Sequence, residues 1–333
     1  MTDQTSATPV VTALDAATPR PRWQVILIRP ETMTLILLVL AFVVSSLLSP
    51  YFLDINYILQ SFTLTAEFSI VALVMTMIII AGEIDLSPAA NMALSACLFA
   101  WTFQATGSMP LALVVGIGAG VLMGVFNGLL VIGLQLPSII VTIGTLTLYR
   151  GIAQIIAGDE SIRLPEYFIG FNTWLIAGIP APDLLFVVLS IGLGLVLGTT
   201  IYGRQIYQTG TNEIAAQHAG IRTRRLKMGL FITMGFVSAI AGIITASRLG
   251  SVRYDLGLGG ELQMVLMAML GGTYIFGGRG SILGTFLAAW LLSVISTGMT
   301  TANLLPATQL CVLGVLLIIS IIATNFIYSR TQR

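Results

Sequence analysis

Long apolar runs alternate with short polar intervals along almost the whole chain. A helix rises 1.5 Å per residue, so about 20 apolar residues cross the roughly 30 Å of hydrocarbon in a bilayer. Ten runs approach this length, and the pattern predicts an all-α integral membrane protein with about ten transmembrane helices. Some runs are short, so we expect their helices to tilt, break or extend. The expected spans are 33–48, 58–81, 89–106, 110–133, 138–157, 183–201, 228–248, 262–276, 281–299 and 305–327.

The longest polar interval between the first and last apolar runs is 203–228, and it carries five of the fifteen basic residues. A polar stretch of this length has to lie in water, where it can contact something outside the membrane. Asn212 is a suitable N-cap, Glu213 is favourable in a first helical turn, and Gly220 can end a helix in the left-handed conformation. These signals predict a short helix over 213–219.

The spacing of small residues gives this predicted helix a distinctive face. Ala215, Ala216 and Ala219 share one face by their three- and four-residue separations, whereas Glu213 and Gln217 share another. Exposed helices more often carry Lys or Glu at such alanine positions, so a small, flat face favours insertion into a groove of a partner. A plain amphipathic helix in a loop is the alternative.

Composition supports the membrane assignment, since 56% of the residues are hydrophobic and only 9% are charged. Ordinary soluble domains carry roughly 25% charged residues. The net charge of +1 and the scattered basic residues give no reason to expect a nucleic-acid partner. The chain has no Gly-x-x-x-x-Gly-Lys-Ser/Thr sequence and no metal-ligand spacing around its single His218. We therefore expect no catalytic residue, no metal and no bound nucleotide in this chain.

Basic residues also predict the orientation, because Lys and Arg near helix ends favour the cytoplasmic side. With a cytoplasmic N-terminus, ten crossings place both 203–228, which includes Lys227, and the C-terminus in the cytoplasm. They leave Arg163 and Arg253 outside, with Arg248 close to the outer boundary. The longest outer interval, 158–182, is either a solvated connector or a landing surface for an external partner.

The chain is expected to divide into a tail and a membrane domain. Residues 1–24 are rich in Thr, Ala and Pro without apolar periodicity, which predicts a disordered cytoplasmic tail. Residues 25–333 are expected to form one transmembrane domain that contains the 203–228 loop.

A second group of polar residues interrupts the apolar pattern after the second run. Gly82, Glu83, Asp85 and Ser87 precede Pro88, and Ser followed by Pro is a strong signal for the start of a helix. One helix therefore stops and the next begins around two carboxylates. The carboxylates either lie at the wet interface or line the inner mouth of a pathway, where irregular backbone is tolerated.

Polar residues within the apolar runs are further candidates. Glu67 and Arg150 are expected in the outer half of the bilayer, where an unpaired charge is costly, so they either pair with each other or line an aqueous vestibule. Uncharged polar residues that could line a pathway are Asn91, Asn127, Thr142, Thr145 and Gln263.

Four segments together resemble a known family. Gly82-Glu83-Ile84-Asp85-Leu86-Ser87 resembles the Gly-Gly-Ile-Asp-Leu-Ser signature of the permease subunits of ribose-, xylose- and arabinose-type ABC importers. Three further blocks occur in the same order as in that family, and the resemblance covers most of residues 58–300. Glu83 departs from the family, which has Gly there, and so does the Pro88-Ala89-Ala90 run. The other blocks are 127–151, 202–221 and 271–284.

The resemblance implies a type II ABC importer-like permease fold with a short cytoplasmic coupling helix, in a bacterial cytoplasmic (inner) membrane. It implies a dimer with a second copy or a paralogue, an extracytoplasmic solute-binding protein, and separate ATP-binding subunits that hold ATP and Mg²⁺. The cargo would be a sugar or sugar-like solute, whose identity the sequence leaves open. Residues matching the ATPase-coupling element are Glu213, Ala215, Ala216, Ala219, Gly220 and Arg222.

A transporter of another class is the alternative. Glu67, Glu83 or Asp85 could relay protons in an ion-coupled secondary transporter, which needs no ATPase. The negative charge of Glu83 at the expected inner mouth leaves its effect on gating open.

Overall fold

The structure is a computed structural model that describes residues 30–48 and 50–331. The predicted tail, 1–24, lies outside the described residues.

Helices form at all ten predicted spans. Six of the helices that the structure describes are long and apolar enough to cross a membrane, namely α3, α5 with its extension, α6, α7, α10 and α12. By contrast α11 has 11 residues, so it is about 16 Å long and too short to cross alone. The helices are α2 (Pro30–Leu48), α3 (Ile55–Ile80), α4 (Pro88–Thr106), α5 (Met109–Gly128), α6 (Ser138–Ala157), α7 (Ala181–Thr199), α10 (Thr223–Leu249), α11 (Gly260–Leu270), α12 (Ile282–Thr301) and α13 (Pro306–Thr331).

Short elements fill the connections. A single-turn η1 (Pro50–Leu53) precedes α3, and a π-helical turn, η2 (Leu129–Gly133), extends α5. The polar interval contains α8 (Ile201–Thr211) and α9 (Glu213–His218).

The interval 158–182 is structured rather than a simple connector. It holds five short elements, and β1 pairs antiparallel with β4 (Ser251–Val252), a segment far away in sequence. These two segments therefore share one side of the molecule, as the positions of Arg163 and Arg253 predicted. The elements are β1 (Ile162–Arg163), η3 (Glu166–Phe168), η4 (Phe171–Thr173), β2 (Leu175–Ile176) and β3 (Ile179–Pro180).

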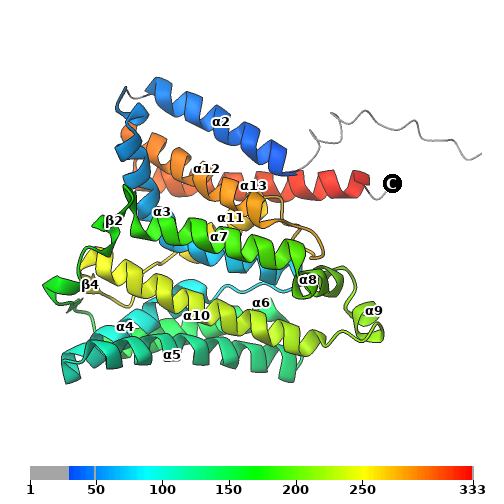
Figure 1. Ribbon diagram of the computed structural model, residues 1–333, viewed down its shortest axis with the longest axis horizontal. Coiled ribbons are helices and arrows are strands. Elements are labelled where there is room, and N and C mark those ends of the chain that lie inside the picture. Colours follow the sequence, from blue (N-terminus) through cyan, green and yellow to red (C-terminus); the bar gives the residue numbers. More distant parts are fainter. Residues whose placement is uncertain (1–29, 49, 332–333) are drawn as a thin grey trace, which may run out of the picture.

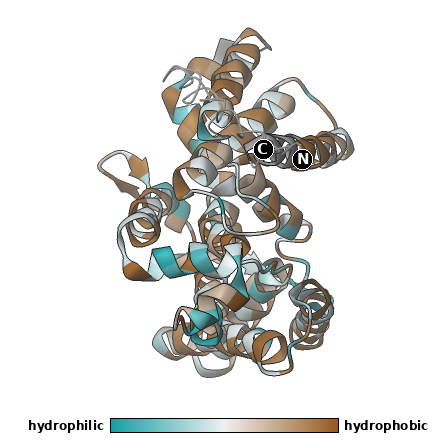
Figure 2. Ribbon diagram, turned by 90° about the vertical axis from the view of Figure 1, so that its right-hand side faces the viewer, coloured by the Kyte–Doolittle hydropathy of each residue, from teal (hydrophilic) through white to brown (hydrophobic). Residues whose placement is uncertain are grey.

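The long helices lie side by side along the longest axis, with α8 and α9 at one end and the short strands at the other (Figure 1). We call these the α9 end and the β4 end. The start of α2 and the end of α13 both lie at the α9 end, as an even number of crossings requires (Figure 1). Viewed from the α9 end, hydrophilic residues gather on segments that face the viewer, against largely hydrophobic helices (Figure 2).

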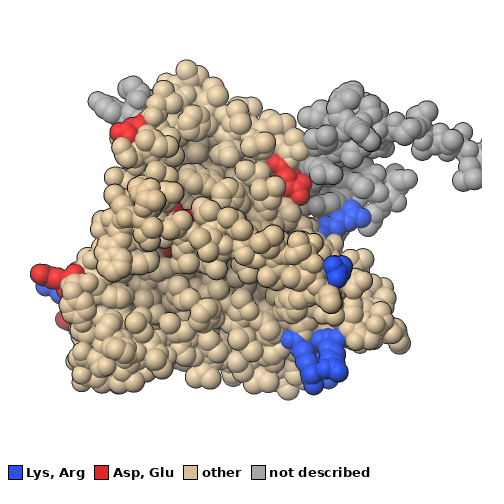
Figure 3. Space-filling view, viewed as in Figure 1, with Lys and Arg blue, Asp and Glu red and all other residues tan. Residues whose placement is uncertain are grey.

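Helix α3 lies at the centre of the bundle and is buried almost continuously from Ala66 to Ile80, against α7, α10, α11 and α12. The outward surfaces of α2, α5 and α6 carry exposed large apolar side chains, for example Val39, Leu122 and Ile140. On the face shown in Figure 3, charged side chains lie mainly towards the two ends, and the basic ones are mostly at the α9 end. This distribution is that of an all-α integral membrane protein.

Candidate functional site

Helix α9 begins where its local signals predict and ends within one residue of the predicted position. The Asn212 Oδ1 atom accepts a hydrogen bond of 3.0 Å from the Ala215 amide, which caps the first turn. Gly220 has a φ of +84°, and beyond it the Ile221 amide donates back to the Ala216 carbonyl. This left-handed ending suits glycine, because it has no Cβ. The helix runs over 213–218, one residue shorter than predicted.

The expected contact face of α9 is wrong in one position. Ala216 is 4% exposed because it packs onto the bundle, whereas Ala215 and Ala219 are exposed. Adjacent helical positions point about 100° apart, so one alanine can be buried while its neighbour faces outward. The large apolar side chain on the exposed surface of α9 is instead Ile214, which is 70% exposed. Arg222, at the start of α10, is also exposed.

Lys227 connects α9 to the loop that follows α3. Its ammonium Nζ lies 2.6 Å from Glu83 Oε1 and 2.6 Å from Glu213 Oε2. Lys227 is 7% exposed, so this pairing supplies the carboxylates that a buried cation requires. Desolvation raises the pKa of Glu213, but the hydrogen bond and charge of Lys227 outweigh it and hold that pKa below its usual value. We call Glu83, Lys227 and Glu213 the ionic bridge.

The position of Glu83 explains why this chain tolerates an acid where the similar family has glycine. Gly82 ends α3 with a φ of +86°, and the Glu83 amide donates to the Ile78 carbonyl at 3.1 Å. Of these two residues, only Gly82 takes the left-handed conformation, because Glu83 does not have a positive φ. The turn therefore needs the first glycine of the signature but not the second.

Backbone contacts join three segments at the α9 end. The Gly278 amide donates to the Ile80 carbonyl at 2.8 Å, so the 277–281 segment and the end of α3 lie on one side. Gly210 of α8 packs so closely there that a Cβ would lie 1.7 Å from the Ile80 oxygen. Ser281 caps α12 by accepting from the Gly284 amide at 3.1 Å. We call Ile80, Gly210 and Gly278 the glycine junction.

Asp85 and Ser87 are buried rather than at a wet interface. Asp85 Oδ1 accepts from the Ser87 amide at 2.8 Å and from its hydroxyl at 2.7 Å. Ser87 thus precedes α4 as predicted, but its side chain bonds Asp85 and Asn127 instead of capping the helix. Burial raises the pKa of Asp85 to about 6, although the two Ser87 hydrogen bonds lower it. The loop is fixed by an internal network that Tyr149 extends, donating to Asn127 Oδ1.

The uncharged candidate pathway residues lie within helix contacts. Asn91 donates to the Gly120 carbonyl at 3.3 Å, and Thr142 donates to the Ser138 carbonyl at 2.8 Å. Asn91, Asn127, Thr142 and Thr145 are at most 3% exposed, so they do not line an open pathway in this structure. Gln263, at the start of α11, is only partly buried.

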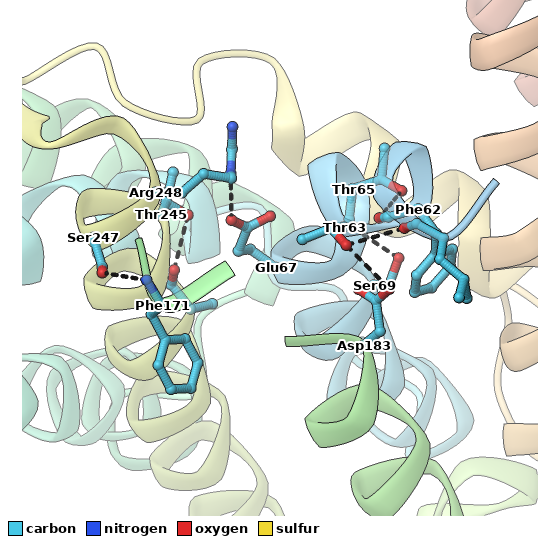
Figure 4. A network of polar contacts seen from close by, with 12 residues as sticks. Phe62, Thr63, Thr65, Glu67, Ser69, Phe171, Asp183, Thr245, Ser247 and Arg248 are labelled. Carbon is cyan, nitrogen blue, oxygen red and sulfur yellow. Dashed lines mark hydrogen bonds and ion pairs between the residues drawn. The ribbon is translucent and has the colours of Figure 1, made fainter. Parts of the chain in front are cut away.

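Glu67 pairs with a different arginine from the one expected. Glu67 Oε1 accepts a 2.7 Å hydrogen bond from Arg248 Nε, across the gap between α3 and α10 (Figure 4). Arg150 instead donates to the Tyr254 and Leu256 carbonyls at 2.8 and 2.7 Å, so it holds the turn after β4. The predicted Glu67–Arg150 pair is wrong because α10, not α6, packs against α3 at this depth.

A second buried carboxylate lies near Glu67. Asp183, at the start of α7, is 2% exposed and accepts from the Thr63 hydroxyl at 3.1 Å, and Thr63 stands one helical turn before Glu67 (Figure 4). Thr63 also lines a recess of about 570 Å³ between α3, α12 and η4, towards the β4 end. No lining residue of this recess is charged. Most of the lining residues carry a hydroxyl or amide group, including Gln60, Ser61, Asn172, Ser296 and Thr300, although the surface that they present to the recess is mainly apolar.

Sequence reasoning missed three charged residues that these networks use, namely Lys227, Arg248 and Asp183. In the sequence, Lys227 and Arg248 indicate only on which side of the membrane their segments lie. The signal that could have found Lys227 is Glu83 itself, because a carboxylate near a bundle of apolar helices needs a cation from the same side.

The fold and the site define a class of protein, a multi-pass transport permease with a capped helix outside its bundle. The family described as "Branched-chain amino acid transport system / permease component" matches residues 57–321, and the chain belongs to this family. It is a membrane-spanning permease subunit of an ABC importer and is not itself an enzyme. Such subunits work with ATPase, binding-protein and permease partners. Membership does not favour the ion-coupled alternative.

Curated relatives agree with this assignment. The chain is 32% identical over 268 residues to the autoinducer 2 import system permease protein LsrC of Escherichia coli (strain K12 / DH10B), covering 80% of this chain and 78% of LsrC. It is 33% identical over 310 residues to the permease protein LsrD of the same type of system in Enterobacter sp. (strain 638), covering 90% and 94%. LsrD of Escherichia coli O9:H4 (strain HS) is 31% identical over 306 residues. No solved structure matches the chain significantly.

Proposed function

We propose that this permease imports a sugar-like, uncharged polyhydroxylated solute, of which autoinducer 2, named for its relatives, is the leading example. The observation that supports this choice of solute is the recess near the β4 end, whose lining offers hydroxyl and amide groups but no charge. Such groups suit a neutral polyol, whereas an amino acid would bring an ammonium and a carboxylate that need charged partners. The recess therefore favours the relatives' cargo over the one in the family description.

The α9 end faces the cytoplasm in this proposal, and the membrane is the bacterial inner membrane. Exposed Arg222, Arg224 and Arg225 at the start of α10 support this orientation by the positive-inside rule. Residues 25–333 then form one transmembrane unit with both chain termini inside. The β4 end, with the recess, would receive a solute-binding protein from outside.

Separate ATP-binding subunits would dock on α9, and ATP and Mg²⁺ would be held there rather than in this chain. Helix α9 packs on the bundle through one buried residue and leaves Ile214 exposed. This exposed apolar side chain supports α9 as the docking helix, with Ile214 at the centre of the interface. Ala215, Ala219, Gly220 and Arg222 surround it. Movement of α9 would reach the transport pathway through the 81–87 loop.

A second permease would complete the pathway, and we propose a paralogue for this role. The strain Escherichia coli O9:H4 (strain HS) has both an LsrC and an LsrD, two permease proteins named for one import system. This chain is similar to both, so a partner of its own type is expected, and a homodimer is the alternative.

Reconstituted importer in liposomes tests the proposed function. We expect the permease, its ATPase and a loaded binding protein to take up autoinducer 2 or a related sugar with ATP inside, and a protonophore to leave uptake unchanged. A binding protein that carries leucine instead would contradict the proposed solute. Uptake without ATP that collapses with the proton gradient would contradict ATP-driven import.

A further inference from the structure

Helix α9 is attached to the bundle through few side chains. Ala216 is its one buried residue, and Gln217 donates to the Thr223 hydroxyl at 3.0 Å. The remaining polar attachment is the charge-assisted bond from Lys227 to Glu213. A recess of about 470 Å³ lies beside α9, so part of its flank has no packing partner. The ionic bridge is therefore the strongest polar link between α9 and the bundle.

The ionic bridge also reaches a second movable element. Lys227 belongs to α10, but its two carboxylate partners come from α9 and from the 81–87 loop. An ammonium has three donors, and two of them are committed to these carboxylates. Because the ammonium is buried and an unpaired buried charge is costly, Lys227 tends to keep both carboxylate partners when one of them moves. Displacing Glu213 thus pulls on Glu83.

We propose that Lys227 is a positioning residue that transmits displacement of α9 to the 81–87 loop through Glu83 and Glu213. This inference rests on the proposed function, in which a partner ATPase displaces α9. A glycine at position 83 has no side chain that could join such a bridge, so the link depends on the acid that distinguishes this chain from the signature it resembles. The glycine junction provides a parallel backbone route, and the ionic bridge adds a side-chain route to it.

The test is the amount of solute imported per ATP hydrolysed by the assembled importer in liposomes. The complexes are purified intact before reconstitution, so that ATPase released from misfolded permease does not add to the measured hydrolysis. We expect Lys227→Met to lower the ratio at least fivefold, and Lys227→Arg, which keeps a cation between the carboxylates, to stay within twofold of the unmodified protein. Arg225→Met removes an exposed basic residue of the same helix end and is the matched control, also expected within twofold.

A second variant, Glu83→Gln, tests the same inference if Lys227→Met does not fold. Glu83→Gln keeps a hydrogen-bond acceptor and removes the charge, and we expect the ratio to fall at least threefold. A normal ratio in either folded variant overturns the inference while leaving the proposed function intact. If the unmodified importer shows no ATP-driven uptake at all, the proposed function fails instead.

Discussion

Substituting Gly210 by alanine tests whether α8 and the end of α3 are joined as the glycine junction shows. The new Cβ would lie 1.7 Å from the Ile80 carbonyl oxygen, whereas real Cβ atoms essentially never approach closer than 3.0 Å. The backbones therefore have to separate by about 1.3 Å, the difference between these distances. This movement also strains the 2.8 Å hydrogen bond from the Gly278 amide to the same oxygen.

The expected cost follows from these two effects. Overpacking costs about 1–3 kcal/mol, and a buried carbonyl deprived of its partner costs about 1–3 kcal/mol. Alanine has a higher helix propensity than glycine, which stabilises the variant by about 1 kcal/mol. The free energy of unfolding should therefore fall by about 3 kcal/mol in total. At roughly 2–4 °C per kcal/mol, the apparent Tm should fall by roughly 6 to 12 °C.

A thiol-reactive dye measures this change in a Cys311→Ser background. Cys97 is fully buried and Cys311 is exposed, so in this background the dye reacts only when the bundle opens. Gly198→Ala is the matched control, because Gly198 lies in α7 and a methyl group added there would have no heavy atom within 4 Å, so its Tm should stay equal or rise. Equal Tm values for the two alanine variants would refute the junction.

Two further predictions concern buried charges. Glu67→Gln and Arg248→Met should show a coupling free energy of at least about 1 kcal/mol in a double-mutant cycle of unfolding, whereas Glu67→Gln with Arg150→Met should show almost none; the reverse result would contradict the observed pairing. Asp85 has a folded pKa of about 6, above its ordinary 3.8, so its folded form holds the proton more tightly and stability falls as pH rises from about 4 through 6. Asp85→Asn should remove that fall and stabilise the protein at pH 7 by on the order of 3 kcal/mol. Unfolding followed by tryptophan fluorescence measures the free energy of unfolding against pH, and parallel curves for Asp85→Asn and the unmodified protein would contradict the burial of an ionisable group.

Local signals in the sequence predicted local structure well. Apolar run length located the ten helices of the bundle, and Asn212 and Gly220 marked helix ends that the structure confirms. Each of these signals acts over a few residues, through a side-chain cap or a backbone conformation. The short strands β1 and β4 were not visible, because two residues carry no alternating pattern.

Long-range pairing could not be predicted from the sequence. Glu67 and Arg248 are 181 positions apart, and Glu83 and Lys227 are 144 positions apart. Several basic residues compete for each acid on the same membrane side, and only the packing of α3 against α10 selects one. The burial of Asp85 likewise depends on α5 and α6, which close over the 81–87 loop.

The central claim is that α9 is where the driving ATPase meets this permease. A photo-crosslinking residue at position 214 tests it directly, because Ile214 is 70% exposed. Leu258, in the turn after β4, is 73% exposed and provides the matched position at the opposite end. We predict that position 214 crosslinks to the ATP-binding subunit in the assembled importer and that position 258 does not. Crosslinking of the ATPase at 258, or none at 214, would contradict the account.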